Sequence, residues 1–327
     1  MSRDLNKLNS NSKLLNDIPK TLLPNKIIST RVIKGGLNNR NILLNENWLV
    51  KQYLHRDEEN DPVYLRFLRE RETLLLLKDN PHVPKLLKYH EDPPNLYLVR
   101  EWVRGRPITV NQIQKNPTML IEVLISIHKG VKSTGGDFQY LDVIKRYLRE
   151  YNRAETSITN DPGQFTDFSD LPPYHQIEQF YTDCLFQIQD FNSSKDSVRI
   201  HGDLVFSNII LTEEQRNLVF IDWEYSTLGN PLIDLAYLFS QNQVPLELQW
   251  ILINEYESQL KVTVNPDELK GYYNLMSLMS ALWYAIQAFR LKSSSLPVAK
   301  QEISLPEFIK LALETFSSLN LYDNLSK

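Results

Sequence analysis

The chain has 327 residues, which is long enough for one large or two ordinary domains with a sizeable hydrophobic core. Its 36 basic and 40 acidic residues give a net charge of -4, which argues against a nucleic-acid or membrane-surface partner. The single cysteine, Cys184, excludes an internal disulfide, and the sequence shows neither a membrane-length apolar run nor a signal-peptide core, so we expect a soluble protein of the cytoplasm.

Residues 1–25 are rich in Asn, Lys and Leu with weak helical spacing, and we expect a tail or a loosely attached helix there. Short apolar runs bounded by turn residues then predict strands over about 26–34, 41–44 and 48–53. Gly35 and Gly36 separate the first two runs. A Gly-rich turn lets backbone amides approach an anion because no Cβ blocks the way, although most such hairpins are only turns.

Lys51 lies within the third predicted strand. A strand lysine can extend into solvent, or it can serve as a fixed cation for phosphate groups. The helix predicted over 63–77 carries two glutamates, Glu70 and Glu72, that could pair with this lysine. Helical periodicity does not choose between them, because each lies on its own apolar stripe.

Two more apolar runs, 85–90 and 95–102, predict a five-stranded sheet with one helix, and hence an α+β fold. The next segment, 103–109, has turn residues and no periodicity, which is typical of a hinge between two lobes. We therefore expect one lobe over 26–103 and a second over 104–327.

The pattern beyond the hinge is mostly helical. A strong helix start, with an asparagine cap, a proline and a glutamate, occurs at Asn265 and opens a helix that runs toward Arg290. The other predicted helices cover 119–129, 141–151, 176–191, 232–240, 247–260 and 306–317.

The stretch from His201 to Ala236 carries the chemistry. Asp203 lies in a short loop after an apolar run, Asn208 follows five residues later, and Asp222 closes the next apolar run. Phosphoryl transfer from ATP needs such a set: one Asp to accept the proton of the attacking hydroxyl, and an Asn and an Asp to hold Mg²⁺.

The strings HGDLVFSN and IDWEYSTLGNPLIDLA resemble the signature of a superfamily that includes choline and ethanolamine kinases, thiamine kinases and aminoglycoside phosphotransferases. The likeness is strongest to the choline- and thiamine-kinase-like branch. It implies a bilobal, protein-kinase-like fold, with a small five-stranded antiparallel sheet lobe and a larger, mostly helical lobe. It further implies that the first lobe, 26–103, binds nucleotide and that the second, 104–327, is catalytic and binds the substrate.

The resemblance also implies roles for particular residues. Asp203 is the catalytic base and His201 supports its loop, while Asn208 and Asp222 hold Mg²⁺. The residues expected to bind ATP are Gly35, Gly36 and Asn38 of a GGLNN phosphate loop, Lys51 with Glu70 as its partner, and the backbone of Glu101 and Val103, which would bond adenine.

The acceptor is expected to be a small cationic alcohol, with thiamine and choline or ethanolamine close together. The run WEYS after Ile221 and Asp222 resembles that of choline and thiamine kinases, whereas Gly202 stands where choline kinases usually carry Asn. Aromatic faces with nearby carboxylates suit a quaternary cation, so Glu224, Trp283 and Tyr284 are predicted substrate residues, although aromatic residues at helical spacing are often core packing.

Two alternatives remain open. The protein could be an aminoglycoside phosphotransferase, with an acidic pocket for a polyamine, or a catalytically silent kinase fold that senses nucleotide. A protein kinase is disfavoured, because Trp-Glu follows Asp222 where Phe-Gly would stand. Oligomeric state is not predicted.

Overall fold

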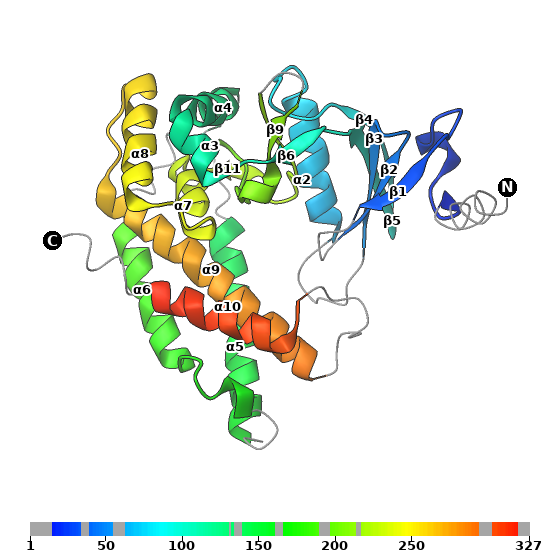
Figure 1. Ribbon diagram of the computed structural model, residues 1–327. Coiled ribbons are helices and arrows are strands. Elements are labelled where there is room, and N and C mark those ends of the chain that lie inside the picture. Colours follow the sequence, from blue (N-terminus) through cyan, green and yellow to red (C-terminus); the bar gives the residue numbers. More distant parts are fainter. Residues whose placement is uncertain are drawn as a thin grey trace. The chain divides into compact units, whose positions relative to one another are not determined.

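The computed structural model describes residues 15–33, 39–54, 63–130, 132–133, 139–160, 166–189, 197–213, 217–293 and 303–319. These residues form two compact units (Figure 1). The first unit takes residues up to 108 together with 207–226, and the second takes 109–206 together with 227 onward. Segment 207–226 thus returns to the first unit, a feature that the proposed lobe boundary at residue 103 did not include; the boundaries of the functional domains stay a prediction.

The first unit is built on a five-stranded antiparallel sheet with the order β1-β2-β3-β5-β4, which confirms the predicted sheet. Its strands are β1 (Thr30–Ile33), β2 (Asn39–Leu44), β3 (Trp48–Tyr53), β4 (Leu86–Asp92) and β5 (Asn95–Glu101), and its helix is α2 (Val63–Leu76). Lys51 lies opposite Asn41 on β2 and Leu98 on β5, so it sits on a central strand. A solvated edge lysine is therefore excluded.

Alternation along β3 divides its side chains between the two faces of the sheet. Tyr53, which has the same parity as Lys51, packs edge-on against Phe67 of α2 with ring centroids 5.5 Å apart. Val50 faces the other way and joins a hydrophobic cluster with Ile18 and Leu22. Residues 15–24, which include the short 3-10 helix η1 (Lys20–Leu22), are therefore packed against the sheet and are not loosely attached.

A second, three-stranded sheet in the first unit has the order β10-β9-β6. Its strands are β6 (Gly105–Pro107), β9 (Ile209–Thr212) and β10 (Leu218–Phe220). Pairing of β9 with β6 explains why segment 207–226 belongs to this unit. The backbone N–H of Ile221 donates to the carbonyl of Asn208 at 2.9 Å, so the two ends of the β9–β10 hairpin are bonded together next to Asp222.

The second unit is mostly helical, as predicted. Its helices are α3 (Val110–Lys115), α4 (Pro117–Gly130), α5 (Gln139–Asn160), α6 (Tyr174–Gln189), α7 (Leu232–Gln241), α8 (Leu246–Leu260), α9 (Pro266–Lys292) and α10 (Leu305–Ser318), with the 3-10 helix η2 (Thr166–Phe168). A small sheet of β7 (Lys132–Ser133), β8 (Ser197–Ile200) and β11 (Thr227–Gly229) completes it. α9 packs against α5, α6, α7 and α10 and forms the centre of the unit.

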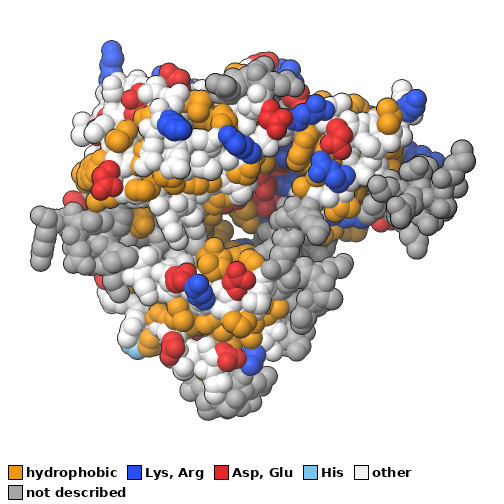
Figure 2. All heavy atoms as spheres, viewed as in Figure 1, with side chains coloured by type: hydrophobic (Ala, Val, Ile, Leu, Met, Phe, Trp, Pro, Cys, Tyr) orange, Lys and Arg blue, Asp and Glu red, His pale blue; other side chains and the backbone are white. Residues whose placement is uncertain are grey.

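The cap predicted for α9 is confirmed. The Asn265 side chain accepts hydrogen bonds from the N–H groups of Asp267 at 2.9 Å and Glu268 at 3.3 Å. Among the described residues, no helix combines the length and the apolar character needed to cross a membrane. On the face shown in Figure 2, basic and acidic side chains are interspersed.

Candidate active site

The Lys51 ammonium is the centre of a buried charge cluster in the first unit. Its Nζ lies 2.6 Å from Glu70 Oε2 and 3.1 Å from Glu224 Oε2, and it also donates to Asp222 Oδ1. Burial alone would lower the pKa of Lys51, but the charges of Asp222, Glu224 and Glu70 outweigh it and hold the pKa well above its usual value. The lysine therefore carries a full positive charge.

Glu70, and not Glu72, is the helix residue that pairs with this lysine. Glu70 is fully buried on the stripe of α2 that includes Phe67 and Leu74, and it also accepts a hydrogen bond from Tyr53 Oη at 2.5 Å. The Glu72 side chain is 60% exposed and lies 3.5 Å from Arg71. Two apolar stripes left the choice open in the sequence, and packing of the first stripe against the sheet decides it.

Two buried arginines extend the cluster. Arg66 Nη1 lies 3.6 Å from Glu224 Oε2, and Arg100 Nε lies 4.0 Å from Glu70 Oε1. Three cations, counting Lys51, thus face the three carboxylates of the cluster, so its formal charge is balanced. Such balance matters because a buried charge without a partner costs several kcal/mol.

Glu224 was expected to contact the substrate, and the structure places its carboxylate in this cluster. Besides Lys51 and Arg66 it meets Asn39, whose Nδ2 donates to Oε2 at 2.6 Å. Burial raises the pKa of Glu224, although the charges of Lys51 and Arg66 oppose the rise. Sequence reasoning missed these partners, because Asn39 and Glu224 are 185 positions apart.

Asp222 sits on a strained backbone. Its φ is 68°, in the left-handed region that non-glycine residues rarely adopt. The turn is held by the bond from Ile221 to Asn208 and by the indole N–H of Trp223, which donates to the carbonyl of Phe220 at 3.0 Å. This conformation brings the Asp222 carboxylate to Lys51 while leaving 36% of its side chain exposed.

The donor set of this region fits a hard divalent cation. Ligand oxygens of Glu70, Asp222 and Glu224 lie within 4.8 Å of one another, and oxygen ligands are those that Mg²⁺ prefers. Lys51 and Arg66 already engage the two buried glutamates, so Asp222 is the carboxylate best able to offer an oxygen. The expected second ligand, Asn208, is buried at the adjoining end of the hairpin.

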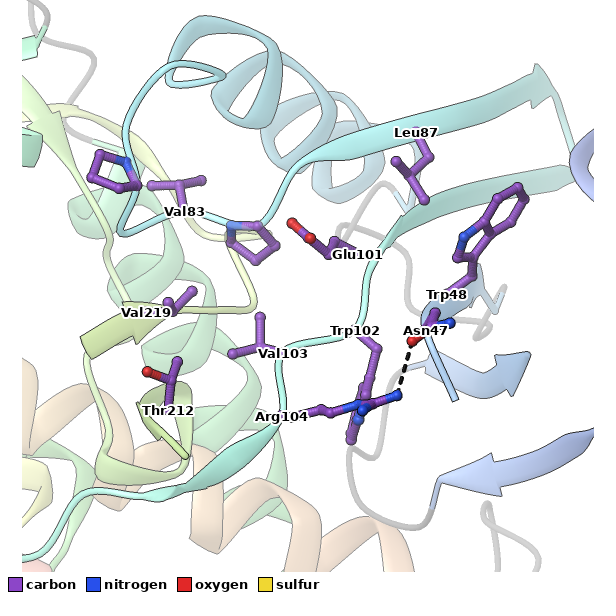
Figure 3. A pocket seen from close by; sticks show the side chains of 12 residues that line it. Asn47, Trp48, Val83, Leu87, Glu101, Trp102, Val103, Arg104, Thr212 and Val219 are labelled. Atoms are coloured by element: carbon purple, nitrogen blue, oxygen red, sulfur yellow. Dashed lines mark hydrogen bonds between the residues drawn. The ribbon is translucent and has the colours of Figure 1, made fainter. Parts of the chain in front are cut away.

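The hinge segment lines a pocket of about 420 Å³ (Figure 3). Its lining residues are Asn47, Trp48, Pro81, Val83, Pro84, Leu87, Glu101, Trp102, Val103, Arg104, Thr212 and Val219. The N–H of Trp102 donates to the carbonyl of Asn47 at 2.7 Å, which fixes the segment. Trp48 and Lys51 point to opposite faces of β3, so this pocket belongs to the face away from the lysine. The adenine contacts of Glu101 and Val103 stay a prediction.

The loop from His201 to Phe206, here called the catalytic loop, belongs to the second unit. The N–H groups of His201 and Gly202 each donate to the carboxylate of Asp234 on α7 at 2.9 Å. Gly202 has a φ of 80°, so the turn here requires the conformational freedom of glycine. The N–H of Asp203 in turn donates to His201 Nδ1 at 3.2 Å, which agrees with a supporting role for that histidine.

A buried histidine of α4, His128, contacts the Asp234 carboxylate that holds this loop. His128 Nε2 lies 3.0 Å from Asp234 Oδ2, and its Nδ1 lies 3.2 Å from Tyr256 Oη. The carboxylate can only accept, so Nε2 carries the proton of this hydrogen bond. Burial would raise the pKa of Asp234, but the hydrogen bond and charge of His128, with His201 and the Gly202 N–H, hold it below its usual value.

Three aromatic residues of α9 and α10 form a group, and the charge of Asp203 acts on one of them. Burial first, and then the charge of Asp203, raise the pKa of the Tyr284 hydroxyl. Trp283 and Tyr284 of α9 have ring centroids 5.3 Å apart, and that of Phe308 of α10 lies 6.0 Å from Trp283. Of the predicted substrate residues, Tyr284 is thus within electrostatic range of the proposed base, and Trp283 packs beside Tyr284. Gly35, Gly36 and Asn38 lie outside the described residues.

A family model described as the phosphotransferase enzyme family matches residues 29–270, and the chain belongs to that family. This membership confirms the superfamily that the sequence resembles, and the similar proteins include choline kinases as well as aminoglycoside phosphotransferases.

Three similar proteins illustrate this. Protein LicA of Haemophilus influenzae is 34% identical over 74 residues, which cover 23% of this chain and 27% of LicA. The choline kinase LicA of Streptococcus pneumoniae is 20% identical, with a TM-score of 0.68 over 95% of this chain and 99% of that one. APH(2″)-IIia, solved with GDP and kanamycin, is 15% identical with a TM-score of 0.61 over 95% and 99%. At these identities the structural likenesses show the fold, which confirms the predicted protein-kinase-like architecture.

Proposed function

We propose that the protein is a kinase that transfers the γ-phosphoryl group of ATP to the hydroxyl of a small cationic alcohol, namely choline, ethanolamine or thiamine. Asp203 accepts the proton of this hydroxyl as its oxygen bonds to phosphorus, and ADP leaves with the electrons of the broken P–O bond. Lys51, held by Glu70, binds the phosphates of the nucleotide.

The observation that carries this proposal is the Lys51 cluster. A fully buried ammonium, kept charged by Glu70 at 2.6 Å and by Asp222, is poorly explained as a stabilising device, because apolar residues in place of a whole set of buried ions are often as stable. The burial of this ammonium is explained if Lys51 is a fixed cation that exchanges a carboxylate partner for the phosphate oxygens of a nucleotide. Asn208 and Asp222 are proposed to hold Mg²⁺, which would neutralise phosphate charge when bound.

The acceptor class is proposed from the surroundings of Asp203. The aromatic rings of Trp283 and Tyr284 pack beside each other, and the charge of Asp203 acts on the Tyr284 hydroxyl. Aromatic faces combined with a carboxylate attract a quaternary ammonium or thiazolium group. The partial exposure of both side chains leaves part of each ring available for a ligand. The similarity in fold to the choline kinase LicA supports the same class.

A coupled assay of ADP release over a panel of acceptors tests the proposal. Choline, ethanolamine and thiamine should raise ATP consumption in the presence of Mg²⁺, and at least one should do so far more than homoserine or methylthioribose. If every acceptor leaves consumption at its background rate, the proposed function has no support. Product analysis by mass spectrometry should show one phosphate added to the active alcohol.

An antibiotic kinase is the second candidate, and the fold shared with the kanamycin complex of APH(2″)-IIia favours including it. Kanamycin in the same panel decides between the two. Preferential consumption with kanamycin, together with resistance in cells that express the protein, would replace the cationic alcohol with a polyamine as the acceptor.

A further inference from the structure

We propose that Asn242 is a positioning residue for Asp203, and that helix α7 holds the catalytic loop at both ends. Asn242 is the residue directly after α7 and caps its C-terminus. The inference rests on the proposed role of Asp203 as the base. It concerns a residue that no motif of the sequence singled out.

The evidence at the C-terminal end of the loop is a pair of hydrogen bonds to one side chain. The backbone N–H of Phe206 donates to Asn242 Oδ1 at 2.6 Å, and Asn242 Nδ2 donates to the carbonyl of Leu204 at 3.1 Å. Nδ2 also donates to the carbonyl of Leu238, four residues earlier on α7, at 2.7 Å. The Asn242 side chain is therefore hydrogen-bonded to its own helix and also to the backbone of the loop on both sides of Val205.

The other end of the loop is bound to the same helix. Asp234, in the first turn of α7, accepts from the N–H groups of His201 and Gly202. Asp234 and Asn242 are eight positions apart along α7, so the helix holds these two attachment points about 12 Å apart. Asp203 lies between them, and its carbonyl accepts from the N–H of Val205 at 2.9 Å. Its side chain thus projects from a backbone that is fixed before, at and after residue 203.

The amide chemistry explains why asparagine suits this position. One carboxamide accepts from an N–H and donates two N–H groups, which is what Phe206, Leu204 and Leu238 require. Alanine provides none of these bonds. Aspartate retains the acceptor but cannot donate when ionised, and it places a negative charge next to two carbonyl oxygens. A base displaced by about 1 Å loses on the order of a hundredfold in rate.

The first test uses hydrogen exchange measured by mass spectrometry on the full chain and needs no acceptor. In Asn242→Ala, peptides that cover residues 201–206 should exchange at least tenfold faster than in the wild type, while peptides from the five-stranded sheet should be unchanged. Equal exchange of the loop in the two proteins would overturn the proposal, whatever the enzyme phosphorylates.

The matched control is Asn265→Ala, which removes the helix cap of α9 and contacts no residue of the catalytic loop. Both variants lose local hydrogen bonds of an asparagine at a helix end, so both should have a lower melting temperature than the wild type. Loop exchange should accelerate only in Asn242→Ala. Equal acceleration in both would show general loosening and would overturn the proposal.

The second test separates positioning from binding. With the acceptor that is active in the panel, kcat of Asn242→Ala should fall ten- to a hundredfold, while the Kd for ATP measured by titration stays within twofold. A kcat as high as that of Asn265→Ala would contradict the inference. If Asn242→Ala yields no folded protein, the isosteric Asn242→Asp decides, and a kcat within twofold of wild type would overturn it. Full turnover in Asp203→Asn would instead refute the proposed role of Asp203. The hydrogen-exchange result would still show whether Asn242 holds the loop.

Discussion

The two groups of functional residues are held in place by different physics. The Lys51 cluster of the first unit depends on charge, with buried ions from four separate segments that each lie within 4.0 Å of an oppositely charged partner. The catalytic loop of the second unit depends on directional hydrogen bonds from backbone groups to Asp234 and Asn242. The comparison teaches that the first group should fail when charge balance is lost, whereas the second should fail when geometry is lost.

The largest expected effect separates chemistry from binding. Asp203→Asn keeps the size of the side chain but removes the proton acceptor, so turnover should fall on the order of a thousandfold. The lysine cluster lies in the other unit and should be unaffected, so the Kd for ATP should change less than twofold. Isothermal titration and steady-state kinetics measure both. Retained turnover would exclude Asp203 as the base, and an inactive wild type that still binds ATP would favour the nucleotide-sensor alternative.

Removing the central cation tests charge balance in the first unit. Lys51→Met leaves three carboxylates, of which Glu70 and Glu224 are buried, facing two arginines, and we expect a loss of about 3–5 kcal/mol in the free energy of unfolding. Adding Glu224→Gln removes one excess negative charge and should recover part of that loss. Urea unfolding measures both variants, with Lys78→Met, at an exposed lysine, as the control. A cost below about 1 kcal/mol would show that the cluster is not held by charge.

Asp234→Asn tests the hydrogen-bonded group, and its effect depends on pH. An amide cannot accept from both loop N–H groups and from His128, so stability at pH 7 should fall by about 3 kcal/mol. The folded-state pKa of Asp234 is lowered, so its contribution is complete above the unfolded value of about 3.9 and is lost as pH falls through the folded value. As the pH is lowered from 7 to 2, the urea midpoint of the variant should therefore fall less steeply than that of the wild type. Parallel curves would contradict this assignment.

The smallest effect concerns backbone strain at Asp222. Both Asp222→Ala and Asp222→Gly remove the carboxylate, so they disturb charge balance alike. Only glycine adopts a φ of 68° without strain, so the glycine variant should be more stable by about 1 kcal/mol. Equal stabilities would mean that the turn relaxes in the alanine variant. Both should lose phosphoryl transfer, since the proposed metal ligand is absent.

The sequence predicted the five-stranded sheet, α2 and the cap of α9 correctly, because these features depend on local periodicity and turn chemistry. It also named Lys51 and Glu70, which the structure brings together. It left Glu70 and Glu72 as alternatives, since two apolar stripes on one helix are indistinguishable until a sheet packs against one of them. It underestimated residues 15–24, whose few apolar side chains complete a cluster formed by distant strands.

The residues that the sequence missed share one property. Asn242 contacts a loop 36 positions earlier, and Arg66 contacts Glu224 from a different segment. Neither Asn at a helix end nor Arg on a helix is unusual in isolation, so no local signal marks them.

The amino-acid sequence alone indicated the class of chemistry, because the strings that contain Asp203, Asn208 and Asp222 resemble a phosphotransferase signature, and the family match confirms that class. The roles of these three residues stay a proposal. Tertiary structure alone decided that Glu70 and not Glu72 pairs with Lys51, and that Glu224 contacts Lys51 and Arg66. It also decided how the loop around Asp203 is held. Those outcomes depend on burial and on contacts between residues far apart in the chain, and only folding brings such residues within reach of one another.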